Sequence, residues 1–405
     1  MSLNKQILLG ALIGILAGIL FSYLGPTHGL YPKAIYVFSL LGGVFVNLLK
    51  MVLIPLVFTS IVTGISNLQA HAKMGRVWKL TLLFFLSTTV ISVVMALTVV
   101  NIVKPGVGVE VAMFKDAMNT FEGGNLSVSE FIQKFLAGLF VNPFKAMAEG
   151  NVLGVVIFAV FLGVALIHLK ERAKIVQGAL NELFDIMMFI VNWIMKLAPI
   201  GIMALLAKLV ATQDLALFQS LGKFVAVVVG ITLFHGIVIL PGILYVLTKV
   251  SPLKYFNAMK DALITAFSTS SSSATMPVTL RCVEENLNVN KHVAGFVVPL
   301  GTTVNMDGTA MYEAAAAIFV ANLVGIELTL VQQVIVFLTA MIAAVGAPGI
   351  PSAGFVTMIM VLQSVGLPVE AIAILLPIDR PLDAIRTVVN VEGDAIGSVI
   401  VNRYA

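Results

Sequence analysis

Long apolar stretches dominate the first 250 positions of the chain, and short polar segments separate them. A helix needs about 20 apolar residues to cross the hydrocarbon core of a bilayer. The pattern therefore predicts six membrane-spanning helices in this part of the chain, near residues 6–24, 34–65, 81–103, 151–168, 186–209 and 225–247. A polar, glycine-containing loop is expected at 104–133.

The last third of the chain has a different pattern, because backbone breakers and polar runs interrupt its apolar segments. A run of serine and threonine fills residues 268–273, and a run rich in glycine and proline fills 346–354. Neither segment can form one unbroken spanning helix. Both are nevertheless apolar at their ends. We therefore predict two re-entrant hairpins, whose tips are buried in protein or line a cavity at membrane depth.

Each predicted hairpin precedes an apolar helix that carries polar residues, first at 293–324 and then at 370–401. Broken elements at corresponding positions of a repeat are the best pointer in a sequence to a transporter's binding site. Two alternatives remain open from the residues, namely a flexible linker for the serine run and an ordinary loop for the glycine–proline run. The predicted fold is an all-α multi-pass membrane protein with eight transmembrane helices, two re-entrant helical hairpins and inverted repeats.

Composition supports a lipid environment. Hydrophobic residues make up 59% of the chain and charged residues only 11%, whereas soluble domains have about 25% charged residues. The net charge of +4 is small, and the basic residues lie in short loops, so we expect no nucleic-acid partner. The single cysteine, Cys282, excludes an internal disulfide and a cysteine-based metal cluster.

Lysine and arginine in short loops predict the orientation in the membrane. The clusters lie an even number of predicted crossings from the start, which places both termini in the cytoplasm and the protein in the cell (inner or plasma) membrane. The residues of these clusters are Lys73, Arg76, Lys79, Lys170, Arg172, Lys174, Lys249, Lys254 and Lys260, and the exceptions are Lys33 and Lys104.

Polar residues form one stripe along the last apolar helix. They recur three or four positions apart, so at about 100° per residue they share one side. Charges within a span cost at least about 2.5–3.5 kcal/mol each, so they face a cavity or pair with one another. The alternative is an Asp–Arg network that only holds helices together. The stripe contains Asp379, Asp383, Arg386, Thr387, Asn390 and Asp394.

The chemistry of the stripe matches one kind of solute. Arg386 can hold a carboxylate by two parallel hydrogen bonds, and Asp383 can hold an ammonium group. Asn390 can donate to a second carboxylate. Asp394 offers a hard anionic oxygen suited to Na⁺. Together these groups predict an acidic amino acid carried with a cation.

A second polar motif, at residues 301–309, interrupts an apolar helix. Gly301 and Gly308 weaken the helix, and carbonyl groups freed by unwinding coordinate Na⁺ where helices break at the midplane. Asn305 and Asp307 add side-chain oxygen atoms. The Asp–Gly pair alone is also typical of a tight turn.

Three further polar residues lie in apolar surroundings. Thr88 and Thr89 add hydroxyl groups to the third span, although they can also bond to their own helix. Glu313 lies among alanines, where the charged form of a carboxyl group is disfavoured, so it is a candidate to carry a proton. The alternative for Glu313 is a structural hydrogen bond.

Taken together, these motifs resemble the dicarboxylate/amino acid:cation symporter family, which includes the excitatory amino acid transporters and archaeal aspartate transporters. The resemblance covers essentially the whole chain and is carried by residues 50–58, 198–201, the serine-rich hairpin, 305–309, the second hairpin and 383–394.

The resemblance implies a homotrimer in the lipid bilayer, with one transporter domain of residues 1–405 that works by an elevator-type movement. The implied scaffold is mainly 1–70 and 128–212, and the implied moving part is mainly 78–103 and 217–402, with hairpins at about 253–283 and 331–366.

The resemblance also implies roles for particular residues. Asp383 is implied to bind the amino group of the substrate. Arg386, assisted by Thr309, is implied to bind the side-chain carboxylate of the substrate. Asn390, together with the first hairpin tip, is implied to bind the α-carboxylate of the substrate. The remaining substrate-site residues implied are Ser271, Ser272 and Thr387, with Ile350 and Gly354 in the extracellular gate.

Three Na⁺ sites are implied, with Na⁺ as the transported coupling ion and no organic cofactor. Glu313 matches the glutamate that carries a proton in animal members, which favours additional H⁺ coupling. The first site consists of Gly301, Asn305, Asn390 and Asp394. The second consists of Thr88, Thr89, Asn305 and Asp307. The third consists of Thr303 with carbonyl groups of Ala344, Val345 and Ala347.

The chain departs from the family in its arginines. Archaeal relatives have an arginine where Ser270 stands, and animal relatives have one where Ala384 stands. Arg380 lies three residues before Asp383 on nearly the same face, so it is the candidate to supply that charge. Pro348 and Ala344 are further departures in the second hairpin.

Other functions fit the sequence less well. Arg386 argues against a symporter or exchanger of neutral amino acids, because their side chains have no carboxylate for it to bind. Asp383 argues against a symporter or exchanger of C4-dicarboxylates, because these substrates have no ammonium group. An intramembrane hydrolase that uses a serine of 270–273 needs a base, and the histidines lie far from this run in sequence. No nucleophile-elbow motif is present either, so we expect no enzyme. A simple channel does not require this set of charges.

Overall fold

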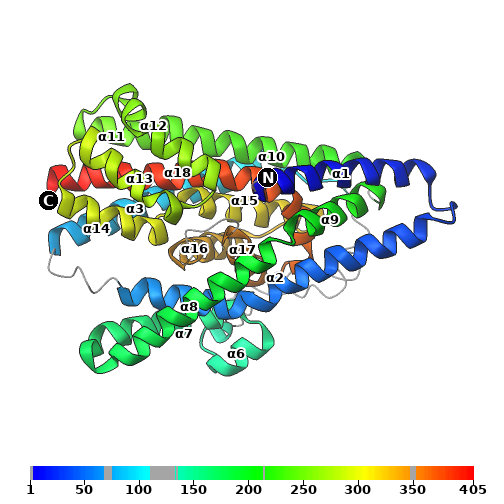
Figure 1. Ribbon diagram of the computed structural model, residues 1–405, viewed down its shortest axis with the longest axis horizontal. Coiled ribbons are helices and arrows are strands. Elements are labelled where there is room, and N and C mark those ends of the chain that lie inside the picture. The colour runs from blue at the N-terminus through cyan, green and yellow to red at the C-terminus, as the bar shows by residue number, and fades with distance from the viewer. Residues whose placement is uncertain (1–2, 68–74, 110–132, 134–135, 213–214, 347–352) are drawn as a thin grey trace.

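The structure is a computed structural model of the 405-residue chain, and it describes residues 3–67, 75–109, 133, 136–212, 215–346 and 353–405. Every regular element within these ranges is helical, which confirms the all-α prediction. Most of the helices run along the long axis of the molecule or obliquely to it (Figure 1).

The first half of the chain supplies mostly long helices. A 3₁₀ turn at Lys170–Ala173 joins α7 to α8. The helices are α1 (Leu3–Leu24), α2 (Tyr31–Asn67), α3 (Gly75–Val103), α6 (Pro143–Glu149), α7 (Val152–Leu169), α8 (Lys174–Met195) and α9 (Ala198–Thr212).

The second half contains more and shorter helices, because the sequence breaks them repeatedly. Short π-helical turns lie at His235–Ile239 and Cys282–Asn286, and a 3₁₀ turn lies at Val369–Ala371. The helices are α10 (Leu215–Phe234), α11 (Leu240–Thr248), α12 (Pro252–Thr269), α13 (Ser272–Arg281), α14 (Lys291–Val304), α15 (Asp307–Leu323), α16 (Leu330–Gly346), α17 (Ala353–Ser364) and α18 (Ile372–Tyr404).

Length and composition alone would allow five stretches of the described chain to cross a membrane. They are Lys5–Leu24, Tyr31–Ser66, Gly75–Val103, Val152–Met195 and Ala216–Thr248.

The unbroken span expected at 186–209 is wrong. Helix α8 ends at Met195 and α9 begins at Ala198. Pro199 is the second residue of α9, a position that tolerates proline, whereas a proline inside a helix removes one backbone hydrogen bond. The apolar character continues across the break, which is why hydrophobicity alone did not reveal it.

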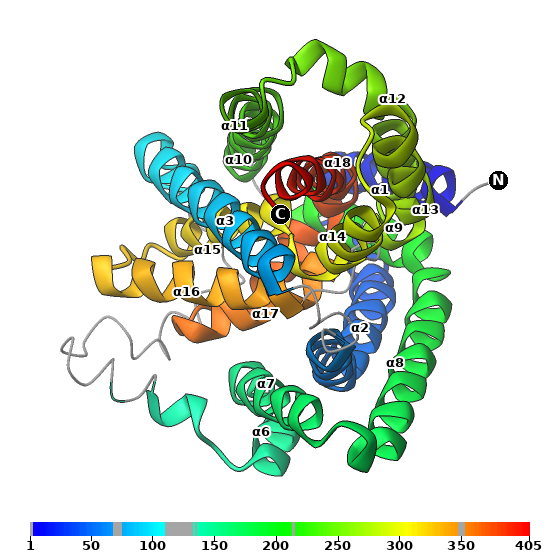
Figure 2. The same cartoon turned by 90° about the vertical axis from the view of Figure 1, so that its left-hand side faces the viewer.

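Most packing contacts fall within two groups of helices, and Figure 2 shows α18 with α3, α11 and α14 around it. In one group, α1 packs against α9, and α2 packs against α7, α8 and α9. In the other, α18 lies at the centre and contacts α3, α10, α11, α12, α14 and α15. The polar stripe of α18 is therefore surrounded by other helices on most sides.

A tight turn separates α12 from α13 at the serine run. Ser270 adopts a left-handed conformation, with φ of 50°, and ends α12. The Ser271 side chain then caps α13 by accepting a hydrogen bond from the backbone N–H of Ala274 at 3.1 Å. Since α12 and α13 pack against each other, the segment is a helical hairpin rather than a flexible linker.

The break between α14 and α15 is narrower than predicted. Only Asn305 and Met306 leave the helical conformation, and both Gly301 and Gly308 lie inside helices. The second hairpin consists of α16 and α17, which pack side by side. Its connecting residues, 347–352, lie outside the described residues, as do the positions 110–132 of the expected polar loop.

Candidate substrate and cation site

The polar stripe of α18 faces the interior of the protein. Its side chains are almost completely buried although five of its six residues are charged or carry an amide. Two prolines, Pro377 and Pro381, lie in the same helix just before and among these residues. The buried members are Asp379, Asp383, Arg386, Thr387, Asn390 and Asp394.

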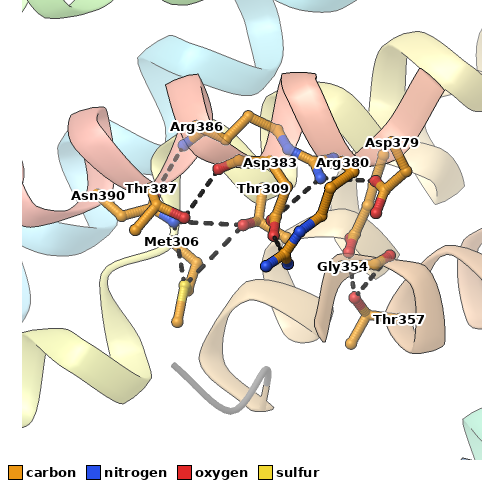
Figure 3. A network of polar contacts seen from close by, with 12 residues as sticks. Met306, Thr309, Gly354, Thr357, Asp379, Arg380, Asp383, Arg386, Thr387 and Asn390 are labelled. Atoms are coloured by element: carbon orange, nitrogen blue, oxygen red, sulfur yellow. Dashed lines mark hydrogen bonds and ion pairs between the residues drawn. The ribbon is translucent and has the colours of Figure 1, made fainter. Parts of the chain in front are cut away.

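Arg386 is the centre of a buried ion-pair cluster (Figure 3). Its Nη2 donates to Asp379 Oδ1 at 2.7 Å and to Asp383 Oδ1 at 3.2 Å. The guanidinium group also lies over the ring of Tyr312, with Cζ 3.8 Å from the ring centroid. Three groups from two helices therefore fix this cation in one place.

Asp383 contacts a second arginine with its other oxygen. Arg380 Nη1 lies 3.6 Å from Asp383 Oδ2, and the Arg380 side chain is 12% exposed. Thr387 Oγ1 donates to the backbone carbonyl of Asp383 at 2.8 Å, so it bonds within its own helix.

Asn390 connects α18 to the break before α15. Its Oδ1 accepts from the backbone N–H of Gly308 at 2.8 Å. Its Nδ2 lies 3.3 Å from Thr309 Oγ1 and 3.2 Å from the sulfur of Met306. Thr309, Arg386 and Asn390, which were predicted to share a substrate, therefore lie close together.

Gly308 allows α15 to approach α18 closely. A Cβ atom at this position would lie 2.8 Å from the backbone oxygen of Arg386, so the helices would have to separate. We therefore expect Gly308→Ala to lower the thermal unfolding midpoint, with a cost of roughly 1–3 kcal/mol typical of overpacking. Gly295→Ala is the matched control, because its Cβ meets no atom within 4 Å. Equal stability of the two variants would contradict the close approach.

The first candidate cation site includes Asp394, which lies about one helical turn after Asn390 in α18. Asn305 Nδ2 donates to Asp394 Oδ1 at 2.9 Å and to the backbone oxygen of Asn390 at 3.2 Å. Asn305 Oδ1 is buried without a hydrogen-bond partner among the described residues. Gly301 has no side chain that would collide with the Asp394 carboxylate. An unpartnered amide oxygen beside a carboxylate is a ligand set suited to Na⁺.

The second candidate cation site surrounds Asp307, the first residue of α15. Thr89 Oγ1 donates to Asp307 Oδ1 at 2.6 Å, and Ser92 Oγ donates to the Asp307 backbone oxygen at 3.2 Å. Thr88 is buried as well, but its hydroxyl bonds to the carbonyl of Phe85 in its own helix. Thr89 Oγ1 also lies 2.8 Å from the carbonyl oxygen of Phe85, so both threonines bond within their own helix, and Thr89 reaches Asp307 as well.

His235 also reaches Asp307, and the sequence analysis did not assign it to the site. Its Nε2 lies 3.1 Å from Asp307 Oδ2, and both side chains are fully buried. His235 begins the π-helical turn between α10 and α11. A histidine in the middle of an apolar span was the available signal, because such residues are rare and usually serve a function.

The second hairpin contacts α15 beside the ion-pair cluster. A Cβ at Gly354 would lie 2.9 Å from Thr309 Cγ2, so the backbone of α17 is close to the predicted substrate site. Thr357, which the sequence did not single out, donates a hydrogen bond to Glu313 Oε1. Of the residues predicted in the gate, Ile350 lies outside the described residues.

The remaining predicted residues that the structure describes lie in α16, in α14 and at the first hairpin tip. Ala344 is buried in α16 and Val345 is partly buried, whereas Ala347 and Pro348 lie outside the described residues. Thr303 Oγ1 donates to the Leu300 carbonyl in its own helix. Helix α13, which begins at the first hairpin tip, contacts both α14 and α18. Its two predicted residues, Ser271 and Ser272, are buried.

A helical chain with broken helices around a buried, charged site has the features of a membrane transporter. The chain belongs to the sodium:dicarboxylate symporter family, which it matches over residues 3–404. This is a family of transporters and not of enzymes, in agreement with the prediction.

Similar proteins with known names cover nearly the whole chain. Excitatory amino acid transporter 3 of Mus musculus is 33% identical over an alignment of 453 positions, which covers 99% of this chain and 86% of the relative. Excitatory amino acid transporter 2 of Homo sapiens is 35% identical over an alignment of 457 positions, which covers 98% of this chain and 79% of the relative.

Proposed function

We propose that this protein is a secondary active symporter that carries an acidic amino acid across the cell membrane together with Na⁺. The main support is the buried pair of Arg386 and Asp383 in α18, whose Nη2 and Oδ1 atoms lie 3.2 Å apart beside Asn390 and Thr309. The names of the similar excitatory amino acid transporters point to the same class of substrate.

Two charges of the cluster and a neighbouring amide have counterparts on an acidic amino acid. Arg386 binds the side-chain carboxylate and gives up part of its contact with Asp379 or Asp383. Asp383 binds the ammonium group. Asn390, with the serines of the first hairpin tip, binds the α-carboxylate. Because Arg386 is fixed by three neighbours, it is oriented before the substrate arrives, which reduces the entropy lost on binding.

Na⁺ is coupled to the substrate because both bind the same short stretch of α18 and α15. Asn390 contacts Gly308 and Thr309 with its side chain, and its backbone oxygen accepts from Asn305. A cation bound by Asn305 and Asp394 therefore orders groups that hold the substrate. If Na⁺ increases substrate affinity, the substrate must increase Na⁺ affinity by the same factor.

The membrane potential adds to this driving force. Each net positive charge that moves inward gains about 2.3 kcal/mol per 100 mV. We further propose the homotrimer, the eight spans with two re-entrant hairpins, cytoplasmic termini, and an elevator movement of residues 78–103 and 217–402 against the rest. The division is supported by the packing of α1, α2, α7, α8 and α9 mainly against one another, with fewer contacts to α16, α17 and α18.

Uptake into proteoliposomes tests the proposed function. Purified protein should accumulate labelled aspartate or glutamate when an inward Na⁺ gradient is imposed, and an inside-negative potential should increase the rate. H⁺ and K⁺ gradients imposed separately identify further coupled ions. Substrate binding that is equally tight with and without Na⁺ would rule out coupling through the shared site.

Glu313 is the proposed carrier of a coupled proton. It is fully buried and accepts a hydrogen bond from Thr357. We expect Glu313→Gln to transport substrate without any response to an imposed proton gradient, because glutamine keeps the shape and cannot release a proton. The measurement is uptake at fixed Na⁺ with and without a pH difference across the membrane. The same response in wild type and variant would assign the proton to another group.

A further inference from the structure

Both oxygens of Asp383 face an arginine in this structure. Oδ1 lies 3.2 Å from Arg386 Nη2, and Oδ2 lies 3.6 Å from Arg380 Nη1. The proposed function places the ammonium group of the substrate at Asp383. An arginine of the protein therefore already occupies the position that an ammonium group would take (Figure 3).

The two arginines are held to different degrees. Arg386 is 1% exposed and has a short contact of 2.7 Å to Asp379 as well as the ring of Tyr312. Arg380 is 12% exposed, and its distance to Asp383 is that of an ion pair rather than a short hydrogen bond. Of the two cations at Asp383, Arg380 is therefore the more exposed and the more distant, so its pair with Asp383 is the one that exchanges more readily.

We propose that Arg380 is an internal substitute for the ammonium group of the substrate, and that it determines how strictly the site requires an amino group. When an amino acid binds, its ammonium group replaces Arg380 at Oδ2. When a dicarboxylate without an amino group binds, Arg380 remains and keeps Asp383 paired. This inference rests on the proposed function, because it assumes that the cluster is the substrate site.

The charge balance of the cluster supports this role. Asp379 and Asp383 carry two negative charges, and Arg380 and Arg386 carry two positive charges, so the charges of these four side chains sum to zero. Without Arg380, a dicarboxylate would bring two more negative charges next to an Asp383 that has lost one of its two cations. Adding negative charge beside a buried carboxylate that keeps only Arg386 as its partner is unfavourable.

The Arg380 contact changes the expected substrate range. The requirement for an ammonium group at Asp383 was the reason to expect that a C4-dicarboxylate such as succinate would be excluded. Since Arg380 can meet this requirement from within the protein, the site should accept a C4-dicarboxylate in addition to the acidic amino acid. Arg380 is therefore a specificity-determining residue.

Competition binding tests the proposal with succinate, which is aspartate without its amino group. The inhibition constants of unlabelled succinate and aspartate are measured against labelled aspartate, at saturating Na⁺, on purified full-length protein. We expect succinate to compete in the wild type. In Arg380→Gln, the ratio of the succinate constant to the aspartate constant should rise on the order of tenfold or more, and Arg380→Lys should return it towards the wild-type value.

The control is Arg281→Gln, which removes an arginine from the exposed pair with Asp261, in which both side chains are 55% exposed. Its ratio should equal that of the wild type. Arg380→Met provides the same test if the glutamine variant does not fold, because it also removes the charge.

Three results would overturn the proposal. The first is that succinate does not compete with labelled aspartate in the wild type. The second is that Arg380→Gln and Arg380→Met leave the ratio of the succinate constant to the aspartate constant unchanged. The third is that both variants weaken the binding of succinate and aspartate equally. A wild type without Na⁺-dependent aspartate binding would instead refute the proposed function. The two failures are thus distinguishable.

Discussion

Arg386→Ala should lose the binding of acidic amino acids almost completely. Arg386 is the only cation that contacts both Asp379 and Asp383 among the described residues. Breaking a buried ion pair by removing one partner typically costs about 3–5 kcal/mol, and each 1.4 kcal/mol corresponds to a factor of ten. We therefore expect the aspartate concentration for half-maximal binding to rise at least about 100-fold, measured by titration of the purified protein.

A second substitution separates the loss of the substrate contact from the loss of stability. Arg386→Ala leaves Asp379 buried without its 2.7 Å partner, which destabilises the fold. Asp379→Asn in the same chain removes that unpaired charge. The double variant should regain thermal stability but not aspartate binding. Recovery of both would mean that Arg386 only holds the helix in place and does not contact the substrate.

The contacts of Arg386 also bear on the alternative interpretation of the polar stripe. The sequence left open whether the aspartates and the arginine form a structural network or a binding site. In the structure they pair with one another within α18, so a network exists. Such pairs fit a site that keeps its charges satisfied until a solute of complementary charge exchanges with them, because unpaired buried charges are costly.

The α18 stripe could be predicted because it depends on local geometry. Residues three and four apart share one side of any helix, so the relation of Asp379, Asp383 and Arg386 is contained in their spacing. The interruption of the helix at 301–309 was predicted for the same kind of reason. Its exact position at Asn305 and Met306 was not, because Gly301 and Gly308 only weaken a helix and packing against α18 decides where it breaks.

Contacts between distant segments could not be predicted from spacing. His235 reaches Asp307 across 72 positions of the chain, and Thr357 reaches Glu313 across 44. Tyr312 is one more apolar residue in the sequence of α15, and only the packing of α15 on α18 places its ring against Arg386. These three residues extend the candidate site by tertiary contacts alone.

Asp394→Asn should lower the apparent affinity for Na⁺ more than it lowers the affinity for the substrate. Asparagine retains an oxygen that can accept from Asn305 Nδ2, which lies 2.9 Å from the present carboxylate, so the fold should persist. The negative charge is lost. Interactions with charged groups are worth about 1.5–3 kcal/mol, so the Na⁺ concentration for half-maximal transport should rise roughly 10- to 100-fold.

The measurement that checks this result is a Na⁺ titration of labelled substrate uptake at several substrate concentrations. Because coupling is reciprocal, high Na⁺ should restore part of the substrate affinity of Asp394→Asn. Asp261→Asn is the matched control, since this aspartate is 55% exposed and forms an exposed ion pair with Arg281. If both variants show the Na⁺ dependence of the wild type, Asp394 is not a ligand of the coupling ion, and the unpartnered oxygen of Asn305 requires a different explanation.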